Sequence, residues 1–417
     1  MTLLVISPDY ASHYGPLAVI ARAVKESGRP VVVATGNGLR PRVEADGFKW
    51  RELNLAASSN TGVVEKNPSI EKFLNATKEG ALETIRYQAM QRQVDLLWEP
   101  EKIVKAIALI HAQIKPDQVL VDHVSFGSTL AMYALAKPFM TLVPGHPSQL
   151  PVANERYGIP AQWPACLSPE PALLSEVEQL ADTVTAAFTE RWNAALKSVA
   201  PERPPVKDAF RVHGSRVLYN SVYGIQNTQR LTQITANHRF VGPLVRTEAL
   251  PENLASWRQK KAHQPQVYVA LGTFLSHRED VLIRIAQALR AVGARAAIAI
   301  GSMQKEQLGP VPDDWIVAGQ LPQVAMLKYA DLAIHHGGNN SVQECLGVGV
   351  QQLVLPFSTD QFANATDLER AKVAQTLDPN RMSTAQLSEA IQAGLNCLSP
   401  SPHSAMTNTC VIEALFD

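Results

Sequence analysis

The segment 331–365 alternates short apolar runs with polar turns, and this pattern constrains the fold more than any other part of the chain. It predicts a strand over Asp331–Ile334, a polar turn over His335–Asn340, a helix over Ser341–Val348 and a second strand over Gln352–Leu355. A strand that passes through Gly-Gly into a helix brings free backbone N–H groups and the positive end of the helix dipole to one point. Such a point is suited to bind a phosphate group.

Polar side chains gather around this turn and around the next one. His336, Asn340 and Ser341 can each donate a hydrogen bond to a phosphate oxygen. Asp360 and Gln361 follow the second predicted strand, where they can bind the hydroxyl groups of a ligand. Two consecutive strand–turn–helix units with these side chains therefore predict a site for a nucleotide that is joined to a sugar.

These residues resemble the nucleotide-sugar signature of the family 1 glycosyltransferases, which reads H-x-G-x-N-S-x-x-E, then a G-V-P-like step, then D-Q. The chain is similar to bacterial members of that family, which act on small hydrophobic natural products. It departs from the signature at Gln351, where the family usually has proline, and at Gln320, where plant members have a tryptophan that stacks on uracil. The matching positions are His336, Gly337, Gly338, Asn340, Ser341, Glu344, Gly349, Pro356, Asp360, Gln361 and Asn364.

The size and charge of the chain narrow the class of protein. Its 417 residues are too many for one hydrophobic core and are a natural size for two domains. The formal net charge is +0 at pH 7, which argues against nucleic acid or an anionic membrane as the main partner. The family resemblance implies that the partners are a UDP-sugar donor and a small-molecule acceptor, and we expect a monomer or weak homodimer.

The sequence also predicts where the protein resides. The N-terminus is apolar over only a few residues and lacks a basic lead, so it indicates a first strand rather than a signal peptide. The sequence holds no run of about 18 apolar residues, the length that a transmembrane helix needs. We expect a cytoplasmic protein whose cysteines are free thiols, because they are far apart and form no metal-type spacing; they are Cys166, Cys345, Cys397 and Cys410.

Strands and helices alternate from the start of the chain. Leu3–Ile6 is predicted to be a strand and Ser7–Gly15 a loop, after which a helix begins at Pro16. Pro30–Ala34 is the next strand, and Asp122 ends a later one. Continuous apolar strands that alternate with helices indicate a parallel sheet covered on both faces.

The alternation restarts after a break near residue 240, with strands predicted at Val267–Leu271 and Ala296–Ile300. We therefore predict an α/β protein with two Rossmann-like domains that face each other across a cleft. With the family resemblance, we expect residues 1–238 to form the acceptor-binding domain and residues 239–417 to form the nucleotide-sugar-binding domain.

The family resemblance implies the same architecture, the two-domain GT-B type fold. In that family the last helix crosses back to the first domain, and Val411–Phe416 is suited to this role.

His13 is the candidate general base. Ligands of doubly wound sheets bind outside the carboxyl ends of the strands, and His13 follows the first strand. A histidine there can remove a proton from an acceptor hydroxyl near neutral pH. From position alone, a surface or helix-capping histidine is the alternative. Ser12-His13-Tyr14-Gly15-Pro16 is similar to the G-H-x-x-P start of the family 1 enzymes, whose histidine is the general base.

Asp122 is the candidate partner of this histidine. A carboxylate beside His13 would fix its tautomer and stabilise the imidazolium that forms when the proton arrives. The resembling enzymes have an aspartate at this point that orients the base. The alternatives are an N-cap for a helix that starts near Ser125, and Asp9 as a competitor for the same role.

The resemblance also assigns the donor site. Thr273 borders the diphosphate, Gln323 reaches the uracil or the ribose, and Glu344 binds the ribose hydroxyls. A solvated helix charge is the alternative for Glu344, and an N-cap pair is the alternative for Asp360 and Gln361. The predicted nucleotide-sugar-binding residues are Thr273, Gln323, His336, Gly338, Asn340, Ser341, Glu344, Asp360 and Gln361. His146 is a weaker candidate, for lining the acceptor pocket.

We expect an inverting transfer of glucose from UDP-glucose to a hydroxyl of a small, largely hydrophobic acceptor, with TDP-deoxysugars as alternative donors. No D-x-D motif lies beside the proposed diphosphate site, so we expect neither a metal nor another cofactor. Two other functions stay open: a nucleotide-sugar 2-epimerase, which shares the two-domain fold, and a non-catalytic auxiliary protein that has kept it. The first strand is not followed by G-x-G-x-x-G, which argues against a nicotinamide dehydrogenase.

Overall fold

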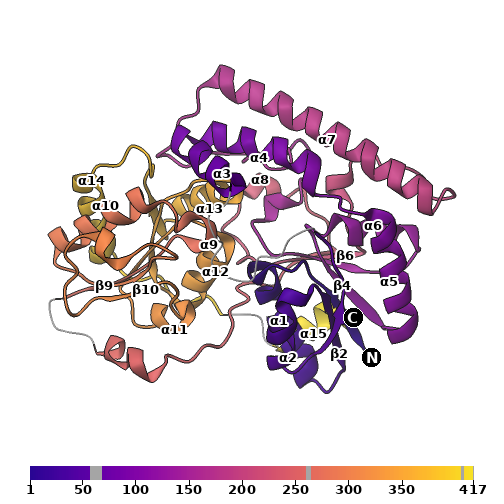
Figure 1. Cartoon of the computed structure of the whole chain (residues 1–417), viewed down its shortest axis with the longest axis horizontal. Coiled ribbons are helices and arrows are strands. Elements are labelled where there is room, and N and C mark those ends of the chain that lie inside the picture. The colour runs from indigo at the N-terminus through magenta and orange to yellow at the C-terminus, as the bar shows by residue number, and fades with distance from the viewer. Residues whose placement is uncertain (57–67, 260–263, 405–407, 417) are drawn as a thin grey trace.

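The computed structural model describes residues 1–56, 68–259, 264–404 and 408–416, which form two α/β domains side by side (Figure 1). Each domain is built on one sheet whose neighbouring strands are all parallel. The prediction of two Rossmann-like domains with parallel sheets is confirmed.

The first sheet has the strand order β3-β2-β1-β4-β5-β6-β7. Its strands are β1 (Leu3–Ile6), β2 (Val31–Thr35), β3 (Lys49–Glu52), β4 (Gln118–Asp122), β5 (Met140–Val143), β6 (Arg216–Tyr219) and β7 (His238–Phe240). The α-helices of this half are α1 (Ala11–Glu26), α2 (Arg40–Ala45), α3 (Pro68–Glu79), α4 (Ala81–Asp95), α5 (Pro100–Ile114), α6 (Phe126–Ala134), α7 (Pro171–Val199) and α8 (Thr228–Leu231).

The second sheet has the order β10-β9-β8-β11-β12-β13. Its strands are β8 (Gln266–Ala270), β9 (Arg295–Ala299), β10 (Ile316–Ala318), β11 (Leu332–His335), β12 (Gln351–Val354) and β13 (Ala374–Thr376). The α-helices are α9 (Gly272–Leu275), α10 (Glu279–Val292), α11 (Gln323–Leu327), α12 (Asn339–Val348), α13 (Thr359–Arg370), α14 (Thr384–Asn396) and α15 (Asn408–Phe416).

Both faces of each sheet are covered by apolar side chains. In β1, Leu4 and Ile6 join one hydrophobic cluster while Leu3 and Val5 join another, because successive side chains of a strand point to opposite faces. The residues of β8 divide between two clusters in the same way. Strands buried on both faces need continuous apolar sequences, and for this reason these strands can be predicted from the sequence.

The strand orders create one crevice in each domain. In the first sheet the chain leaves β1 toward β2 and β3 on one side, and later adds β4 to β7 on the other side. The second sheet reverses in the same manner between β8 and β11. In open α/β sheets, ligands bind outside the carboxyl ends of the strands at such a reversal. The residues after β1, β4, β8 and β11 are therefore placed to form a site.

The first helix begins earlier than the sequence predicts, at Ala11 rather than at Pro16. The backbone N–H groups of His13 and Tyr14 both donate to the carbonyl of Tyr10, so the expected loop is already helical there. Pro16 lies inside this helix, where it removes the hydrogen bond that an N–H at position 16 would donate to the carbonyl of Ser12. His13 is thus held in the rigid first turn of α1.

Residues at the start and at the end of the segment 239–417 belong structurally to the first domain. The predicted boundary at residue 238 falls within β7, which pairs with β6, so the first sheet extends to Phe240. The C-terminal helix α15 packs against α1, with Val411 and Leu415 in the same hydrophobic cluster as Leu17. The guanidinium of Arg29 lies 4.8 Å from the centre of the Phe416 ring.

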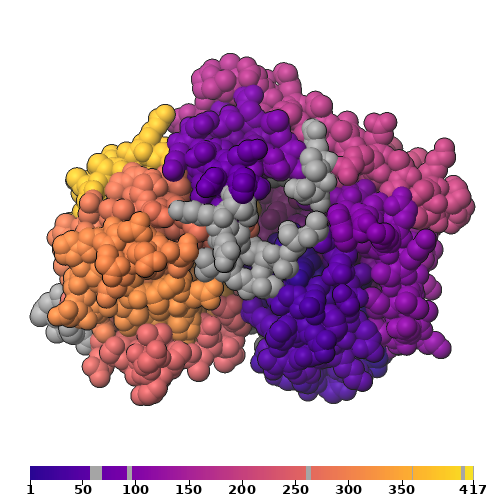
Figure 2. Space-filling model, viewed as in Figure 1, coloured from indigo at the N-terminus to yellow at the C-terminus, as the bar shows by residue number. Residues whose placement is uncertain are grey.

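Helices α3 and α4 lie across the top of both domains in the view of Figure 1, and the molecular surface is hollowed between the domains below them (Figure 2). Arg278, at the start of α10, is almost fully buried and donates hydrogen bonds to Thr77 of α3 and to Asn380. These contacts hold α3 of the first domain against the second domain. None of the described helices is both long and apolar enough to cross a membrane.

Candidate active site

His13 and Asp122 meet at the reversal point of the first sheet. His13 lies in the first turn of α1, after β1, and Asp122 is the last residue of the neighbouring strand β4. Nδ1 of His13 is 3.0 Å from Oδ2 of Asp122, and the aspartate is fully buried. The other carboxylate oxygen accepts a hydrogen bond from the backbone N–H of Val124, at 3.0 Å. The carboxylate is therefore fixed from two sides.

This contact sets the proton position on the imidazole. An ionised carboxylate can only accept, so Nδ1 carries the hydrogen and Nε2 keeps its lone pair. Burial lowers the pKa of His13, but the charge and hydrogen bond of Asp122 and the charge of Asp360 together raise it above the ordinary value of 6.5. The geometry is that of a base whose proton-accepting nitrogen lies opposite its carboxylate partner.

The competing interpretations of these carboxylates do not fit the structure. Asp9 accepts hydrogen bonds from the backbone N–H groups of Gly38 and Leu39, at 3.0 and 2.8 Å, so its carboxylate caps a neighbouring turn. The N-cap residue of α6 is Ser125. Asp122 is therefore not the N-cap of that helix.

The reversal point of the second sheet holds the residues that we predicted to bind a diphosphate. Thr273 lies in α9, directly after β8, and His336 follows β11. The His336 ring lies between two glycines: a Cβ added at Gly272 would lie 2.8 Å from its Cε1, and one added at Gly338 would lie 2.3 Å from its Nε2. Gly272 also has a φ of +78°, which favours glycine. The His336 ring therefore leaves no room for a side chain at either Gly272 or Gly338.

Its surroundings favour the uncharged form of the His336 imidazole. Burial and the neighbouring His335 lower its pKa to about 3, although a hydrogen bond to the carbonyl of Ala270 acts in the other direction. Nδ1 is buried and has no hydrogen-bond partner among the described residues. A polar atom without a partner at this position is available to a ligand.

His335 supports the turn instead of facing the site. Its Nε2 lies 2.9 Å from Oε1 of Gln352, and its Nδ1 accepts a hydrogen bond from the backbone N–H of Gly337 at 3.0 Å. The side chain of Asn364 donates to the carbonyl of the same glycine, at 2.9 Å. Side chains thus form hydrogen bonds with both the backbone N–H and the backbone C=O of Gly337.

Three of the predicted nucleotide-binding residues form one cluster. Nε2 of Gln323 lies 2.5 Å from Oε2 of Glu344 and 3.2 Å from Oγ of Ser341. Glu344 is only 6% exposed, so it is not a solvated helix charge. Burial raises the pKa of this carboxyl, while Arg246 and the hydrogen bond from Gln323 oppose the shift. The cluster presents a carboxylate and an amide next to the N-terminus of α12.

Asp360 and Gln361 occupy the first turn of α13. The side chain of Gln361 accepts from the backbone N–H groups of Phe357 and Ser358, at 2.9 and 3.2 Å, and donates to the hydroxyl of Ser358 at 2.8 Å. This is a capping box in which Ser358 is the N-cap and Gln361 is the residue at position N3, so the side chain of Gln361 caps α13. Asp360 is close enough to His13 for its charge to raise the histidine pKa. The second domain therefore faces the catalytic candidate across the cleft.

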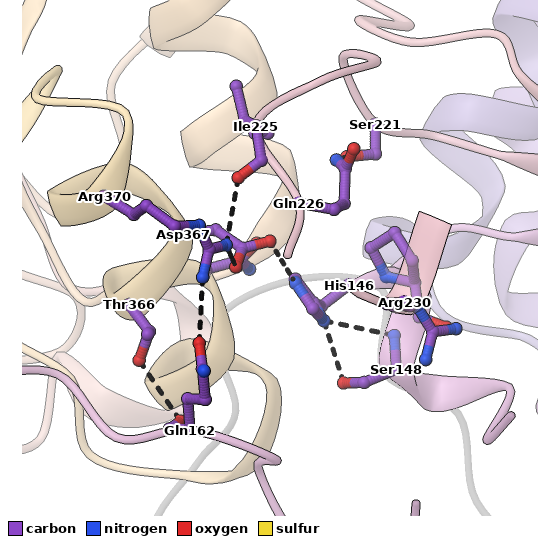
Figure 3. A network of polar contacts seen from close by, with 12 residues as sticks. His146, Ser148, Gln162, Ser221, Ile225, Gln226, Arg230, Thr366, Asp367 and Arg370 are labelled. Atoms are coloured by element: carbon purple, nitrogen blue, oxygen red, sulfur yellow. Dashed lines mark hydrogen bonds and ion pairs between the residues drawn. The ribbon is translucent and has the colours of Figure 1, made fainter. Parts of the chain in front are cut away.

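His146 lies in a contact between the two domains (Figure 3). Its Nε2 is 3.0 Å from Oδ2 of Asp367 in α13, and its Nδ1 accepts from the backbone N–H of Ser148 at 3.1 Å. His146 is 6% exposed and lines a cavity of about 300 Å³. Arg370 binds Asp367 and also donates to Gln162 and Ile225 of the first domain. Both ring nitrogens of His146 are thus engaged in structural contacts.

Asn339 and Asn220 belong to the same interface, and neither is among the residues predicted from the sequence. Nδ2 of Asn339 donates to the carbonyls of Pro144 and Asn220, at 2.8 and 2.7 Å, and both asparagines are buried. Next to them, Nδ2 of Asn340 donates to the carbonyl of Ser12 at 2.7 Å. The adjacent Asn-Asn pair was visible in the sequence, but its partners come from strand ends that only the fold brings together. Among the described residues, no group of three or more His, Cys, Asp or Glu side chains is placed to hold a metal ion.

Solved glycosyltransferase structures share this two-domain architecture. The structure described as the glycotransferase of kitacinnamycin aligns over 99% of this chain and 94% of its own, with a TM-score of 0.67 and 18% identity. Spinosyn rhamnosyltransferase SpnG complexed with thymidine diphosphate aligns over 99% and 95%, with a TM-score of 0.62 and 16% identity. The fold is therefore that of the GT-B glycosyltransferases.

Sequence comparison leads to the same class and narrows it to a family. The chain is 22% identical to NDP-glycosyltransferase YjiC of Bacillus subtilis (strain 168) over 393 residues, 93% of this chain and 86% of that protein. It is 24% identical to the demethyllactenocin mycarosyltransferase of Streptomyces fradiae over 67% of this chain and 57% of that protein. The family described as UDP-glucoronosyl and UDP-glucosyl transferase matches residues 3–399, and the chain belongs to this family.

Proposed function

We propose that the protein is an inverting glycosyltransferase that moves a sugar, with glucose as the first choice, from a UDP-sugar to a hydroxyl of a small, largely hydrophobic acceptor. One observation carries this proposal: the His13–Asp122 pair of one domain lies beside the predicted phosphate-binding turn of the other, since Nδ2 of Asn340 is 2.7 Å from the carbonyl of Ser12. A base in one domain next to a donor-binding turn in the other is what a direct transfer requires.

In the proposed reaction, Nε2 of His13 removes the proton of the acceptor hydroxyl while Asp122 holds the ring and stabilises the imidazolium. The acceptor oxygen then forms a bond to the anomeric carbon from the face opposite the nucleotide. The bond between that carbon and the diphosphate oxygen breaks, and UDP leaves with the electron pair. A single displacement inverts the configuration, so an α-linked donor gives a β-glycoside.

The charge that develops on the leaving diphosphate is met by groups at the second reversal point. These are the hydroxyls of Thr273 and Ser341, the backbone N–H groups that follow Gly338 at the start of α12, and His336. The nearby phosphate charge would raise the pKa of His336 from its low value and favour the imidazolium, which can donate from both nitrogens. In this proposal, the residues take the place of a metal ion.

The nucleoside would bind beside the cluster of Gln323 and Glu344. The buried carboxylate of Glu344 suits the two ribose hydroxyls, and the amide of Gln323 suits the uracil or the ribose. Asp360 would accept hydrogen bonds from sugar hydroxyls, with Gln361 beside it. The relative YjiC is named an NDP-glycosyltransferase and SpnG was solved with thymidine diphosphate, so TDP-sugars are the second candidate donors.

The acceptor would enter on the first-domain side of the cleft. His146 can contribute there only through its cavity-facing edge, since both of its nitrogens have partners. The family names and the solved relatives favour transfer to an acceptor over the 2-epimerase alternative.

Incubation with UDP-glucose, with and without a panel of phenolic and macrolide acceptors, tests the proposal. We expect UDP release that depends on an acceptor, and a product that gains one hexose in mass and shows a β-anomeric NMR signal. A parallel incubation with TDP-sugars identifies the donor. Release of UDP together with a 2-epimerised sugar, and no product with any acceptor, would contradict the proposal.

A further inference from the structure

One hydrogen bond joins the helix of the candidate base directly to the helix of the candidate phosphate site. Nδ2 of Asn340, in the first turn of α12, lies 2.7 Å from the backbone carbonyl of Ser12, in the first turn of α1. The carbonyl of Ser12 belongs to the peptide group that leads into His13. The bond therefore connects the backbone at the base with a residue that we place beside the diphosphate.

The Ser12 carbonyl is available because of Pro16. In an α-helix the carbonyl of a residue accepts from the N–H four positions later, which for Ser12 is position 16. Proline has no N–H, so this carbonyl cannot receive its ordinary partner. Pro16 lies inside α1 and is buried, so the arrangement is a fixed part of the helix. Asn340 supplies the missing donor from the other domain.

The carboxamide of Asn340 can donate one hydrogen bond to the Ser12 carbonyl and another to a ligand at the same time. An asparagine amide has two N–H donors on one nitrogen, and the bond to Ser12 uses one of them. Its Oδ1 lies 3.5 Å from Nδ2 of Asn220, a long contact that is consistent with the same orientation of the amide. The second N–H of Asn340 is therefore the group that can reach a phosphate oxygen.

We propose that Asn340 is a positioning residue that transmits donor binding to the general base, and that Pro16 makes this possible by leaving the Ser12 carbonyl open. The inference rests on the proposed function, because it takes the ligand beside Asn340 to be a nucleoside diphosphate. A bound diphosphate holds the amide of Asn340, and the amide holds the backbone at His13, so that donor binding tightens the placement of Nε2 toward the anomeric carbon.

Pro16→Ala tests the inference with the least disturbance of the donor site. The new N–H at position 16 competes with Asn340 for the Ser12 carbonyl, because it can form the ordinary hydrogen bond within α1. We expect kcat to fall by about three- to tenfold, the range that corresponds to one accessible hydrogen bond. The Kd for UDP, measured by calorimetry, should stay within about twofold, because position 16 lies in the first domain and touches none of the proposed donor-binding residues.

Two further variants separate this effect from a general change in the helix. Gly15→Ala adds a methyl group that meets nothing within 4 Å and creates no new N–H, so turnover should be unchanged. In an Asn340→Ala background at saturating donor, Pro16→Ala should have no further effect, because the bond that it disturbs is already gone. Multiplied effects of the two changes, or full turnover of Pro16→Ala with an unchanged melting temperature, would overturn the inference.

A readout besides activity distinguishes this inference from the proposed function. In ¹⁵N-histidine NMR spectra, UDP should shift the His13 signals of the wild type and should leave those of Pro16→Ala nearly unmoved, although both bind UDP. If the wild type binds UDP and His13 responds, but no acceptor is glycosylated, the proposed function fails and the link through Asn340 stands. If UDP binds and His13 does not respond in the wild type, the link is wrong.

Discussion

Nδ1 of His13 lies 3.0 Å from Oδ2 of Asp122, although 109 positions separate the two residues in the chain. The parallel pairing of β1 with β4 brings them together, because it places the turn after β1 beside the carboxyl end of β4. The aspartate is fully buried and is held by the N–H of Val124 as well. The catalytic candidate is thus oriented by the sheet itself.

Asp122→Asn should reduce turnover by about 10²- to 10⁴-fold, because an amide can donate to Nδ1 and so favours the wrong tautomer of His13. UDP binding should persist, since Asp122 lies in the other domain from the proposed donor site. Asp9→Asn is the matched control: its side chain binds the N–H groups of Gly38 and Leu39, so it should keep its turnover. Steady-state kinetics of both variants, with calorimetry for UDP, decide the point. Comparable losses in the two variants would contradict the assignment.

The pH dependence of kcat/KM should report the raised pKa of His13. A general base works only when deprotonated, so activity should fall on the acid side with an apparent pKa above 6.5. Asp360→Asn removes one of the charges that raise this pKa, so the acid limb should move to lower pH. An acid limb that lies below pH 6.5 in the wild type, or that does not move in the variant, would contradict the electrostatic account.

Gly272→Ala should weaken UDP binding by about tenfold, since the left-handed backbone costs about 1–2 kcal/mol for a residue with a Cβ and the methyl displaces the His336 ring. Gly224→Ala is the control, because Gly224 has a φ of +94° and open space around it. Both variants should melt at a lower temperature, and only Gly272→Ala should bind UDP more weakly. Equal UDP affinity of the two would contradict the placement of His336.

Stability should fall as the pH drops from 6.5 toward 4, because His123 and His335 are buried with pKa values lowered to about 4. The unfolded chain binds protons at these positions first, so a contribution of about 3 kcal/mol from His123 is present above pH 6.5 and lost near pH 4. His13 acts with the opposite sign, since its raised pKa stabilises the fold below pH 6.5. Melting temperatures measured from pH 8 to 4 check this, and His123→Gln should show a shallower decline. A steeper decline in that variant would count against the argument.

Much of the fold could be predicted from the sequence because the fold depends on buried parallel strands. Leu3–Ile6 has the predicted bounds, since a continuous apolar strand leaves little choice of register. The strands Met140–Val143 and Arg216–Tyr219 were missed, although their ends build the interface around Asn220. They lie among proline-rich loops, where short apolar runs carry no clear period.

The site was predictable where a local turn defines it and not where the two domains meet. His336 and Asn340 follow from one strand–turn–helix unit and a family signature. The bond from Asn340 to Ser12, and the burial of His146 against Asp367, depend on how two separately folded domains pack. The start of α1 was missed because a proline normally marks a first turn, and here a carbonyl left open by Pro16 finds its donor across the cleft.

The turnover of His13→Ala, measured beside its affinity for UDP, tests the central claim most directly. If His13 is the general base, turnover should fall by about 10²- to 10⁴-fold while UDP binding is unchanged, because the imidazole acts on the acceptor and not on the nucleotide. A His13→Ala enzyme that binds UDP and transfers sugar at the wild-type rate would contradict the account.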